Sequence, residues 1–265
     1  MGDSVGEGAS LRYRLDLEEI ITEILTGFIG RSPEEVDPEI ERAMGDIARF
    51  PGADRSYIFT FHESQTLMDC THEWCGPGVE PRAAELQALT VADFPNVVEG
   101  ILRGRAVHMP DISEYPDQTG PEWDELIARG SRSVLLVPMI CGGAILGFLR
   151  LDSLREPARW DKEVIGLVRR AGEAFANSLK RKRRDEEQWL AYKRLLSVIE
   201  FYPDPTFIID REKRVIAWNQ AIEAMTGVRK EEILGQGACA YAVPFFGERR
   251  PILVDLLDLS SSELE

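Results

Sequence analysis

The residues of this chain that could do chemistry gather in one short stretch, Cys70-Thr-His72-Glu-Trp-Cys75. Two thiols, an imidazole and a carboxylate within six residues could bind a metal ion or take part in redox chemistry. The stretch ends a run that reads as a β-strand, in which alternate side chains point to opposite faces of the sheet. On a regular strand Cys70 and His72 share one face, and Cys75 lies on the other. We therefore expect a strand end with partly buried cysteines and no metal site.

The remaining candidates for chemistry are isolated. Cys141 and Cys239 complete the four cysteines, and no Cys-x-x-Cys pattern occurs. His62 and His108 each stand alone, and a lone histidine is more often structural than a ligand. The chain has no P-loop, no glycine motif of the kinase ATPase type and no diguanylate cyclase motif. No histidine follows Lys180 that could accept a phosphoryl group. These absences predict a noncatalytic chain for which the sequence requires no cofactor.

The composition excludes several kinds of partner. The 265 residues carry a net charge of −15, which argues against nonspecific binding of nucleic acid or anionic membranes. No apolar run is long enough to cross a bilayer. The acidic, glycine-rich residues 1–14 lack the apolar core of a signal peptide. We expect a cytoplasmic protein with reduced thiols and a disordered lead-in over 1–14.

The elements that must position these side chains can be read from hydrophobic periodicity. Two helices are expected in the first fifty residues, and Ser32 followed by Pro33 is a good start for the second one. Residues 56–61 and 67–74 form a strand hairpin, and 133–152 form another. The middle region is less regular, with short helices near 81–89 and 122–128.

A long helix is expected from Asp161 to Tyr202, because no proline interrupts this segment. We interpret the charged run at 180–188 as a solvated helical linker, since acidic residues follow the basic ones at once and disfavour a nucleic-acid patch. Apolar residues recur with roughly heptad spacing on both sides of that run, and we expect them to form a parallel homodimer. The residues assigned to this dimer and signalling helix are Val168, Phe175, Leu179, Trp189 and Leu196.

Residues 15–180 resemble a GAF domain in the order and length of their elements. The most specific part is Leu136-Val-Pro-Met139, followed by Gly142, Gly143 and Gly147-Phe-Leu-Arg-Leu151. The resemblance implies an antiparallel sheet with helices on one face and a small-molecule cavity on the other. Some GAF domains attach a bilin next to a Cys-His pair, which is absent here, and a haem-binding one needs an axial ligand such as His62 or His108. The residues assigned to the cavity, which could equally be ordinary core, are Phe59, Phe61, Trp74, Cys75, Phe94 and Trp123.

The segment Asp204–Asn219 resembles the opening hairpin of a PAS domain, and Asn219 is placed to cap the helix that follows. The chain reaches Glu265 before the last three strands of a PAS sheet become evident, so we expect an incomplete domain over 201–265. A helical linker over 181–200 would join it to the GAF domain. The predicted fold class is α+β: a GAF-type sheet with helices, a long signalling helix and a partial PAS-like segment.

This order of modules predicts a sensory input region of a signal-transduction protein such as a sensor histidine kinase. The GAF domain would bind a small molecule or sense redox, and the helix would relay the change to the PAS module and to an output domain outside this chain. Two alternatives remain: a GAF-type reductase of free methionine sulfoxide, and a dimerisation scaffold without a ligand.

Overall fold

The structure is a computed structural model that describes residues 3–115 and 118–258. Contacts divide the chain into two units, Met1–Asp185 and Glu186–Glu265. The division falls inside the longest helix, α5 (Lys162–Glu200). Within the described residues no helix is both long enough and apolar enough to cross a membrane.

The first unit is built on a six-stranded sheet whose paired strands are all antiparallel. Along the sheet the strands follow the order β3-β2-β1-β6-β5-β4. Gly142 and Gly143, at φ 59° and 81°, form the turn between β5 and β6. A Cβ at Gly147 would lie 1.9 Å from the carbonyl oxygen of Phe59, so only glycine allows β6 to approach β1 there. The strands are β1 (Arg55–Phe61), β2 (Leu67–Cys75), β3 (Leu89–Thr90), β4 (Val107–Met109), β5 (Ser133–Cys141) and β6 (Ala144–Ser153).

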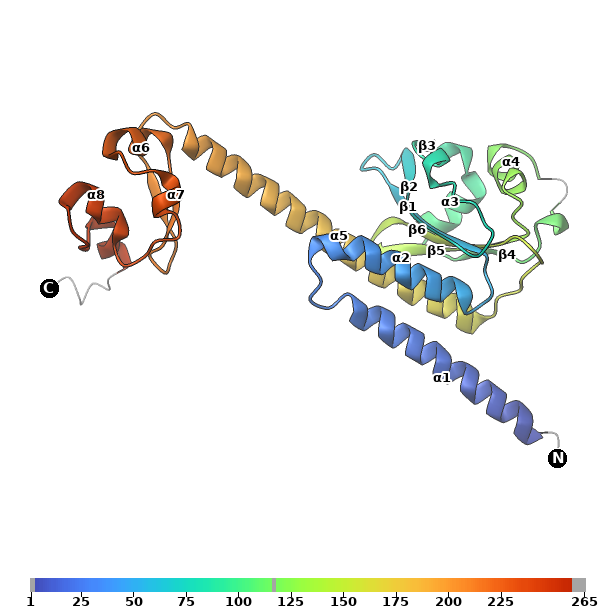
Figure 1. Ribbon diagram of the computed structural model, residues 1–265. Coiled ribbons are helices and arrows are strands. Elements are labelled where there is room, and N and C mark those ends of the chain that lie inside the picture. Colours follow the sequence, from blue (N-terminus) through green and yellow to red (C-terminus); the bar gives the residue numbers. More distant parts are fainter. Residues whose placement is uncertain (1–2, 116–117, 259–265) are drawn as a thin grey trace. The chain divides into compact units, whose positions relative to one another are not determined.

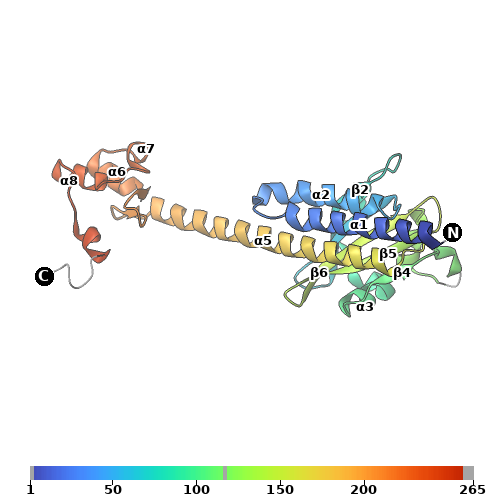
Figure 2. The same cartoon turned by 90° about the horizontal axis from the view of Figure 1, so that it is seen from below.

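Helices cover both faces of this sheet (Figures 1 and 2). One face, here called the helix face, packs against α1 (Asp3–Gly27), α2 (Pro33–Arg49) and α5. The other face, here called the cavity face, lies under α3 (Pro95–Leu102) and α4 (Pro121–Ala128). The predicted α+β class, with an antiparallel sheet and a long helix, is therefore confirmed.

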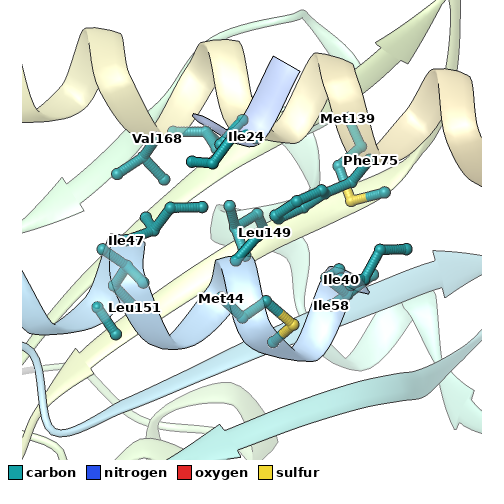
Figure 3. Packing of buried hydrophobic residues seen from close by; sticks show 14 of the residues in the cluster. Ile24, Ile40, Met44, Ile47, Ile58, Met139, Leu149, Leu151, Val168 and Phe175 are labelled. Atoms are coloured by element: carbon teal, nitrogen blue, oxygen red, sulfur yellow. The ribbon is translucent and has the colours of Figure 1, made fainter. Parts of the chain in front are cut away.

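The helix-face core explains why three helices stay on that side. Phe175 of α5 is fully buried and meets Phe28 edge-on at 5.8 Å. Burial of one such aromatic side chain stabilises the fold by roughly 2–3 kcal/mol. Figure 3 shows the residues that interdigitate here, which are Ile24, Ile40, Met44, Ile47, Ile58, Met139, Leu149, Leu151, Val168 and Phe175.

The start of α2 follows the capping signal in the sequence. The backbone N–H of Ser32 donates to Glu35 Oε2 at 2.9 Å, and Pro33 occupies the first turn. The start of α1 differs from the prediction, because the helix begins at Asp3, inside the predicted lead-in 1–14. Tyr13 anchors this part, since its ring lies 5.2 Å from that of Phe50. Met1 and Gly2 lie outside the described residues.

The middle region departs from the sequence prediction in two places. The helix α3 was not predicted, because its eight residues are too few for a clear period. Near 81–89 the structure has one turn of 3₁₀-helix, Ala83–Glu85, and not a longer helix.

The second unit has two strands, β7 (Phe207–Ile209) and β8 (Val215–Trp218), among its described residues. Three short helices follow: α6 (Gln220–Thr226), α7 (Lys230–Ile233) and α8 (Val243–Phe246). An incomplete domain should leave Trp218 of β8 without a covering layer, but the side chain is 1% exposed and its Nε1 donates to the carbonyl oxygen of Val228.

Asn219 holds the second unit together at one point. Its side-chain oxygen accepts from the N–H of Ile222, which caps α6 as predicted, and from the N–H of Thr206. Its Nδ2 donates to the carbonyl oxygens of Tyr202 and Asp204. The buried amide thus fixes the start of the hairpin to the start of the helix.

Candidate functional site

A small cavity lies on the cavity face of the sheet, under α3 and α4. Measured with a water-sized sphere its volume is about 20 Å³, which is room for about one water molecule. The rings of Phe59 and Phe148 stack at 4.9 Å to form part of its wall. The lining side chains, mostly apolar, are Phe59, Met68, Leu89, Phe94, Val97, Glu122, Glu125, Leu126, Leu136, Phe148 and Arg150.

Two acidic residues of α4 reach this cavity, and each has a defined partner. Glu122 is 3% exposed and accepts from the backbone N–H groups of Asn96 and Val97. It therefore caps the first turn of α3 from a neighbouring helix. Glu125 is instead paired with Arg129 and Arg150. Neither carboxylate is left without a partner.

Behind the cavity a buried ionic network fills the same sheet face. Arg150 on β6 donates to both oxygens of Asp152, and Arg55 on β1 donates to Asp152 as well. Burial alone would lower the pKa of Arg150, but Asp152 and Glu125 outweigh it and raise the pKa. Burial would likewise raise the pKa of Asp152, and the two arginines lower it overall. The network stays charged because its members neutralise one another.

The ionic network also leaves polar atoms without partners. Within residues 3–115 and 118–258, five buried side-chain atoms make no hydrogen bond. Two of them, Tyr57 Oη and Arg55 Nε, belong to neighbouring side chains, since the Arg55 guanidinium lies 5.0 Å from the centre of the Tyr57 ring. Buried polar atoms normally have a partner, so this part of the face can accept water or a polar group of a ligand. The five atoms are Arg55 Nε, Tyr57 Oη, His108 Nε2, Trp123 Nε1 and Arg129 Nη1.

The structure brings together some of the six residues predicted for the cavity. Phe59 and Phe94 line it. Phe61 and Trp123 belong to the same apolar cluster but do not line the cavity. The prediction is wrong for Trp74, which packs on the helix face over Gly45. It is also wrong for Cys75, which lies beyond the cavity, paired across the sheet with Arg55.

The faces assigned to the cysteine–histidine stretch are also wrong, because β2 contains a β-bulge. Ile58 pairs with His72, but the next residue, Phe59, pairs with Cys70, so that Thr71 has no partner in β1. Cys70 consequently belongs to the cavity-face cluster, and His72 contacts Asp37 of α2 on the helix face. The stretch cannot bind one metal ion with Cys70 and His72 together.

The two cysteines of this stretch have the properties of buried thiols. Burial raises the pKa of Cys70 to about 12, and burial followed by the charge of Glu73 raises that of Cys75 to about 12. Their partners on β1, Phe59 and Arg55, are four residues apart, which is about 13 Å along a strand. A disulfide needs Cα atoms within about 7 Å, so this pair cannot form one in the folded chain.

Neither isolated histidine lines the cavity. His62 is exposed and its Nε2 lies 2.7 Å from Asp69 Oδ2. His108 packs on the ring of Trp160, and burial lowers its pKa.

The predicted dimer stripe on α5 divides into two parts. Val168 and Phe175 are fully buried in the helix-face core, and Leu179 packs against that core. Their assignment to a dimer interface is wrong, because α1, α2 and the sheet cover this stretch of α5 within the same chain. Trp189 is 57% exposed and Leu196 is half-buried, so both remain accessible.

Comparisons with known families agree with this architecture. Residues 35–179 match the sequence profile described as GAF domain, and residues 193–238 match the one described as PAS fold. A search of curated proteins finds no match to the chain.

Solved structures with the same fold include the following three domains. The chromophore-binding domain of the bacteriophytochrome RpBphP3 from R. palustris is 12% identical with a TM-score of 0.54, over 66% of this chain and 64% of that chain. The phycocyanobilin-bound GAF domain from a cyanobacterial phytochrome is 16% identical with a TM-score of 0.52, over 64% and 96%. The blue-light absorbing form of the Thermosynechococcus elongatus PixJ GAF domain is 20% identical with a TM-score of 0.50, over 63% and 98%. At these identities the likeness shows a shared fold.

Proposed function

Because the GAF profile covers more than half of the 265 residues, the chain belongs to the GAF domain family, and we propose that it is a noncatalytic sensory input region. In this proposal the cavity face binds a small molecule, and α5 passes the change on toward the PAS-fold segment. The observation that carries the proposal is the cavity itself. It is enclosed by two helices that share no core with α5, while the opposite face of the same strands packs on α5. A ligand in the cavity would therefore contact one face of the sheet, and α5 packs on the opposite face of the same strands.

The cavity as it stands does not fit a bilin. Its volume is about 20 Å³, whereas pockets for drug-sized ligands enclose about 300–1,000 Å³. The sequence has no cysteine between Cys75 and Cys141, and Cys70 carries a thiol whose pKa is raised to about 12. The ligand we propose is accordingly a small molecule that fits after modest opening between α3 and α4.

The proposal extends to the context of the domain. The parent protein would be a signalling protein such as a sensor histidine kinase, located in the cytoplasm, where the four free cysteines stay reduced. The exposed apolar residues of α5 after Glu187 would pair two chains as a parallel homodimer. They are Trp189, Leu190, Tyr192, Leu195 and Val198.

Native mass spectrometry of the purified full chain tests the ligand. We expect an adduct of a few hundred daltons that is lost on acid unfolding. The variant Leu126→Trp, which fills the cavity from α4, should carry no adduct. Ile127→Trp is the control, since Ile127 is 63% exposed on the same helix. A chain without an adduct, whose melting temperature no member of a metabolite library changes, would contradict ligand sensing.

The small volume favours one second candidate, a dimerisation scaffold that binds no ligand. The same experiment distinguishes the two, because a scaffold carries no adduct yet still dimerises. The alternative of a methionine sulfoxide reductase gains no support, since Cys70 and Cys75 are too far apart to form a disulfide and neither is activated as a thiolate.

A further inference from the structure

We infer that Asp37 is a positioning residue for α5: its carboxylate ties the helix to β2, so that movement of β2 beside the cavity is passed to α5 at Lys182. The inference rests on the proposed function in one respect, namely that α5 carries the signal. The contacts that lead to it lie within the first unit.

Three consecutive basic residues of α5 reach three different elements. Arg181 Nη2 donates to the carbonyl oxygen of Phe28, which follows α1, at 2.9 Å. Lys182 Nζ donates to Asp37 Oδ2 of α2 at 2.5 Å, and Arg183 Nη2 donates to Glu63 in the β1–β2 turn at 2.5 Å. We call these three residues and their partners the clasp.

The clasp fixes the rotation of α5 about its own axis. Successive residues of a helix point about 100° apart, so the three contacts span about 200° of its circumference. Rotation in either direction must break at least one of them. The Arg183–Glu63 pair is largely exposed and contributes little, whereas the side chains of Lys182 and Asp37 are 20% and 42% exposed. Of the two ion pairs, the one with Asp37 therefore contributes more.

Asp37 joins the clasp to the sheet. Its Oδ2 accepts from Lys182, while its other oxygen lies 3.4 Å from His72 Nε2 on β2. Burial would raise the pKa of Asp37, but the hydrogen bond and charge of Lys182, with a smaller effect of His72, lower it overall. One ionised carboxylate thus lies between a strand and the signalling helix.

His72 lies beside the bulge, and the bulge lies beside the cavity. Cys70, two residues earlier, points to the opposite face, and its Sγ donates to the carbonyl oxygen of His72 at 3.4 Å. Met68 and Phe59, which flank the bulge on β2 and β1, both line the cavity. A ligand that displaces these two side chains displaces the backbone that carries His72. The route from cavity to helix is then β2, Asp37 and Lys182.

Hydrogen exchange of the full chain, read at the amides of 180–186, tests the clasp. In Asp37→Asn we expect these amides to exchange about three- to tenfold faster, with the same change in Lys182→Gln. The matched control is Asp46→Asn, because Asp46 lies on the same helix and forms its ion pairs with Arg42 and Arg49 of that helix. Unchanged exchange in Asp37→Asn, at an unchanged melting temperature, overturns the inference.

A double-mutant cycle tests the link to the cavity. Met68→Ala loosens β2 at the cavity wall and should speed exchange at 180–186 at least twofold, but add nothing in the Asp37→Asn background. Leu126→Ala removes similar volume from the same cavity through α4 and should leave 180–186 unchanged. Additive effects of Met68→Ala and Asp37→Asn would show that Asp37 is a structural contact only and overturn the coupling.

The outcome is separable from that of the ligand experiment. Exchange at 180–186 is measured without ligand, so the clasp can be confirmed in a chain that binds nothing. Conversely, if the chain carries an adduct but exchange at 180–186 does not change in Asp37→Asn, the proposed ligand sensing stands and the route through Asp37 is wrong.

Discussion

Burial decides what individual side chains of this protein can do. The stretch with the most reactive residue types holds two cysteines whose pKa is raised to about 12. It also holds a histidine, His72, that is 7% exposed and contacts a carboxylate of another element. At neutral pH both thiols are therefore protonated, which makes them weak nucleophiles.

The thiols of Cys70 and Cys75 should react slowly with alkylating reagents at pH 7.5. A thiol with a pKa of about 12 is almost entirely protonated there, and the thiolate is the nucleophile. Mass spectrometry after brief treatment with iodoacetamide should find both residues mostly unmodified, and both fully modified in urea. Mild oxidation should produce no Cys70–Cys75 disulfide, and its appearance in the folded chain would contradict the strand register described here.

The folded chain should lose stability as the pH falls below about 6.5. Burial lowers the pKa of His72 below this ordinary value, so the unfolded chain binds the proton more readily. The contribution of His72 is fully present above pH 6.5 and is lost toward its folded pKa, at up to about 1.4 kcal/mol per pH unit. Urea unfolding between pH 7 and 5 measures it together with the same effect of His108, whose pKa burial also lowers.

The variant His72→Gln should show a shallower decline over the same range. The lowered pKa values of Asp37 and Asp152 do not interfere, because those carboxylates titrate below their ordinary value of 3.8. An identical slope in the variant and the parent would mean that His72 titrates alike in both states.

The limits of the sequence are clearest at these residues. Composition indicated correctly that Cys70 and Cys75 are partly buried thiols, and alternation placed Phe59 and Phe61 on one face. The bulge at Thr71 was not predictable, because it arises from the register between β1 and β2 and leaves no local pattern. Cavity residues such as Arg150 and Glu125 were missed because their role depends on which helix covers which face.

Among the elements, α5 combines two environments along one helix. Up to Leu179 it is a core helix, covered by α1, α2 and the sheet. From Trp189 onward its large apolar side chains are mostly exposed. Periodicity showed the same roughly heptad spacing on both sides of the charged run. Apolar residues that face their own core and apolar residues that face a second chain have the same spacing, so the sequence could not distinguish them.

Two variants should distinguish these environments. Phe175→Ala removes a fully buried ring and should lower the free energy of unfolding of the first unit by about 3–5 kcal/mol. Trp189→Ala combined with Leu196→Ala should leave that free energy unchanged and weaken self-association. Urea unfolding measures the first effect, and light scattering at about 50 µM, where weak coiled coils associate, measures the second. A parent chain that is strictly monomeric there would rule out the dimer.

For the molecule as a whole, the first unit carries a complete sheet with a core on each face. The second unit has its own core around Trp218 and Tyr241. Each cluster draws its residues from one unit alone. The GAF and PAS resemblances predicted this order of domains, because glycine turns and hairpin patterns are local signals in the sequence. The burial of Trp218 was not predictable in this way, because it depends on α7 and Tyr241 later in the chain.

A shortened protein of residues 1–184 should therefore unfold in one cooperative transition by circular dichroism. Its melting temperature should match that of the first unit within the full chain. A broad, noncooperative melt would show that the first unit needs residues beyond Arg184.

Hydrogen exchange should also rank the two units. Among the described strands β7 pairs only with β8, whereas β5 lies between two neighbours. Because an isolated hairpin is marginal in water, the amides of 207–209 should exchange faster than those of 135–137. Equal protection would mean that the second unit is as stable as the first.

The bulge has a consequence for how this protein can vary. Thr71 has no paired residue on β1, and its exposed side chain lies within hydrogen-bond distance of the Ile58 carbonyl oxygen and of His72 Nδ1. A chain without residue 71 would place His72 directly after Cys70, still opposite Ile58 and Phe59, so every later residue of β2 would keep its face. The loss of any other single residue between Cys70 and Cys75 would instead turn part of β2 to the opposite face, unless the bulge moved or disappeared with it. Among relatives that keep the clasp, position 71 is therefore where we expect the length of β2 to vary.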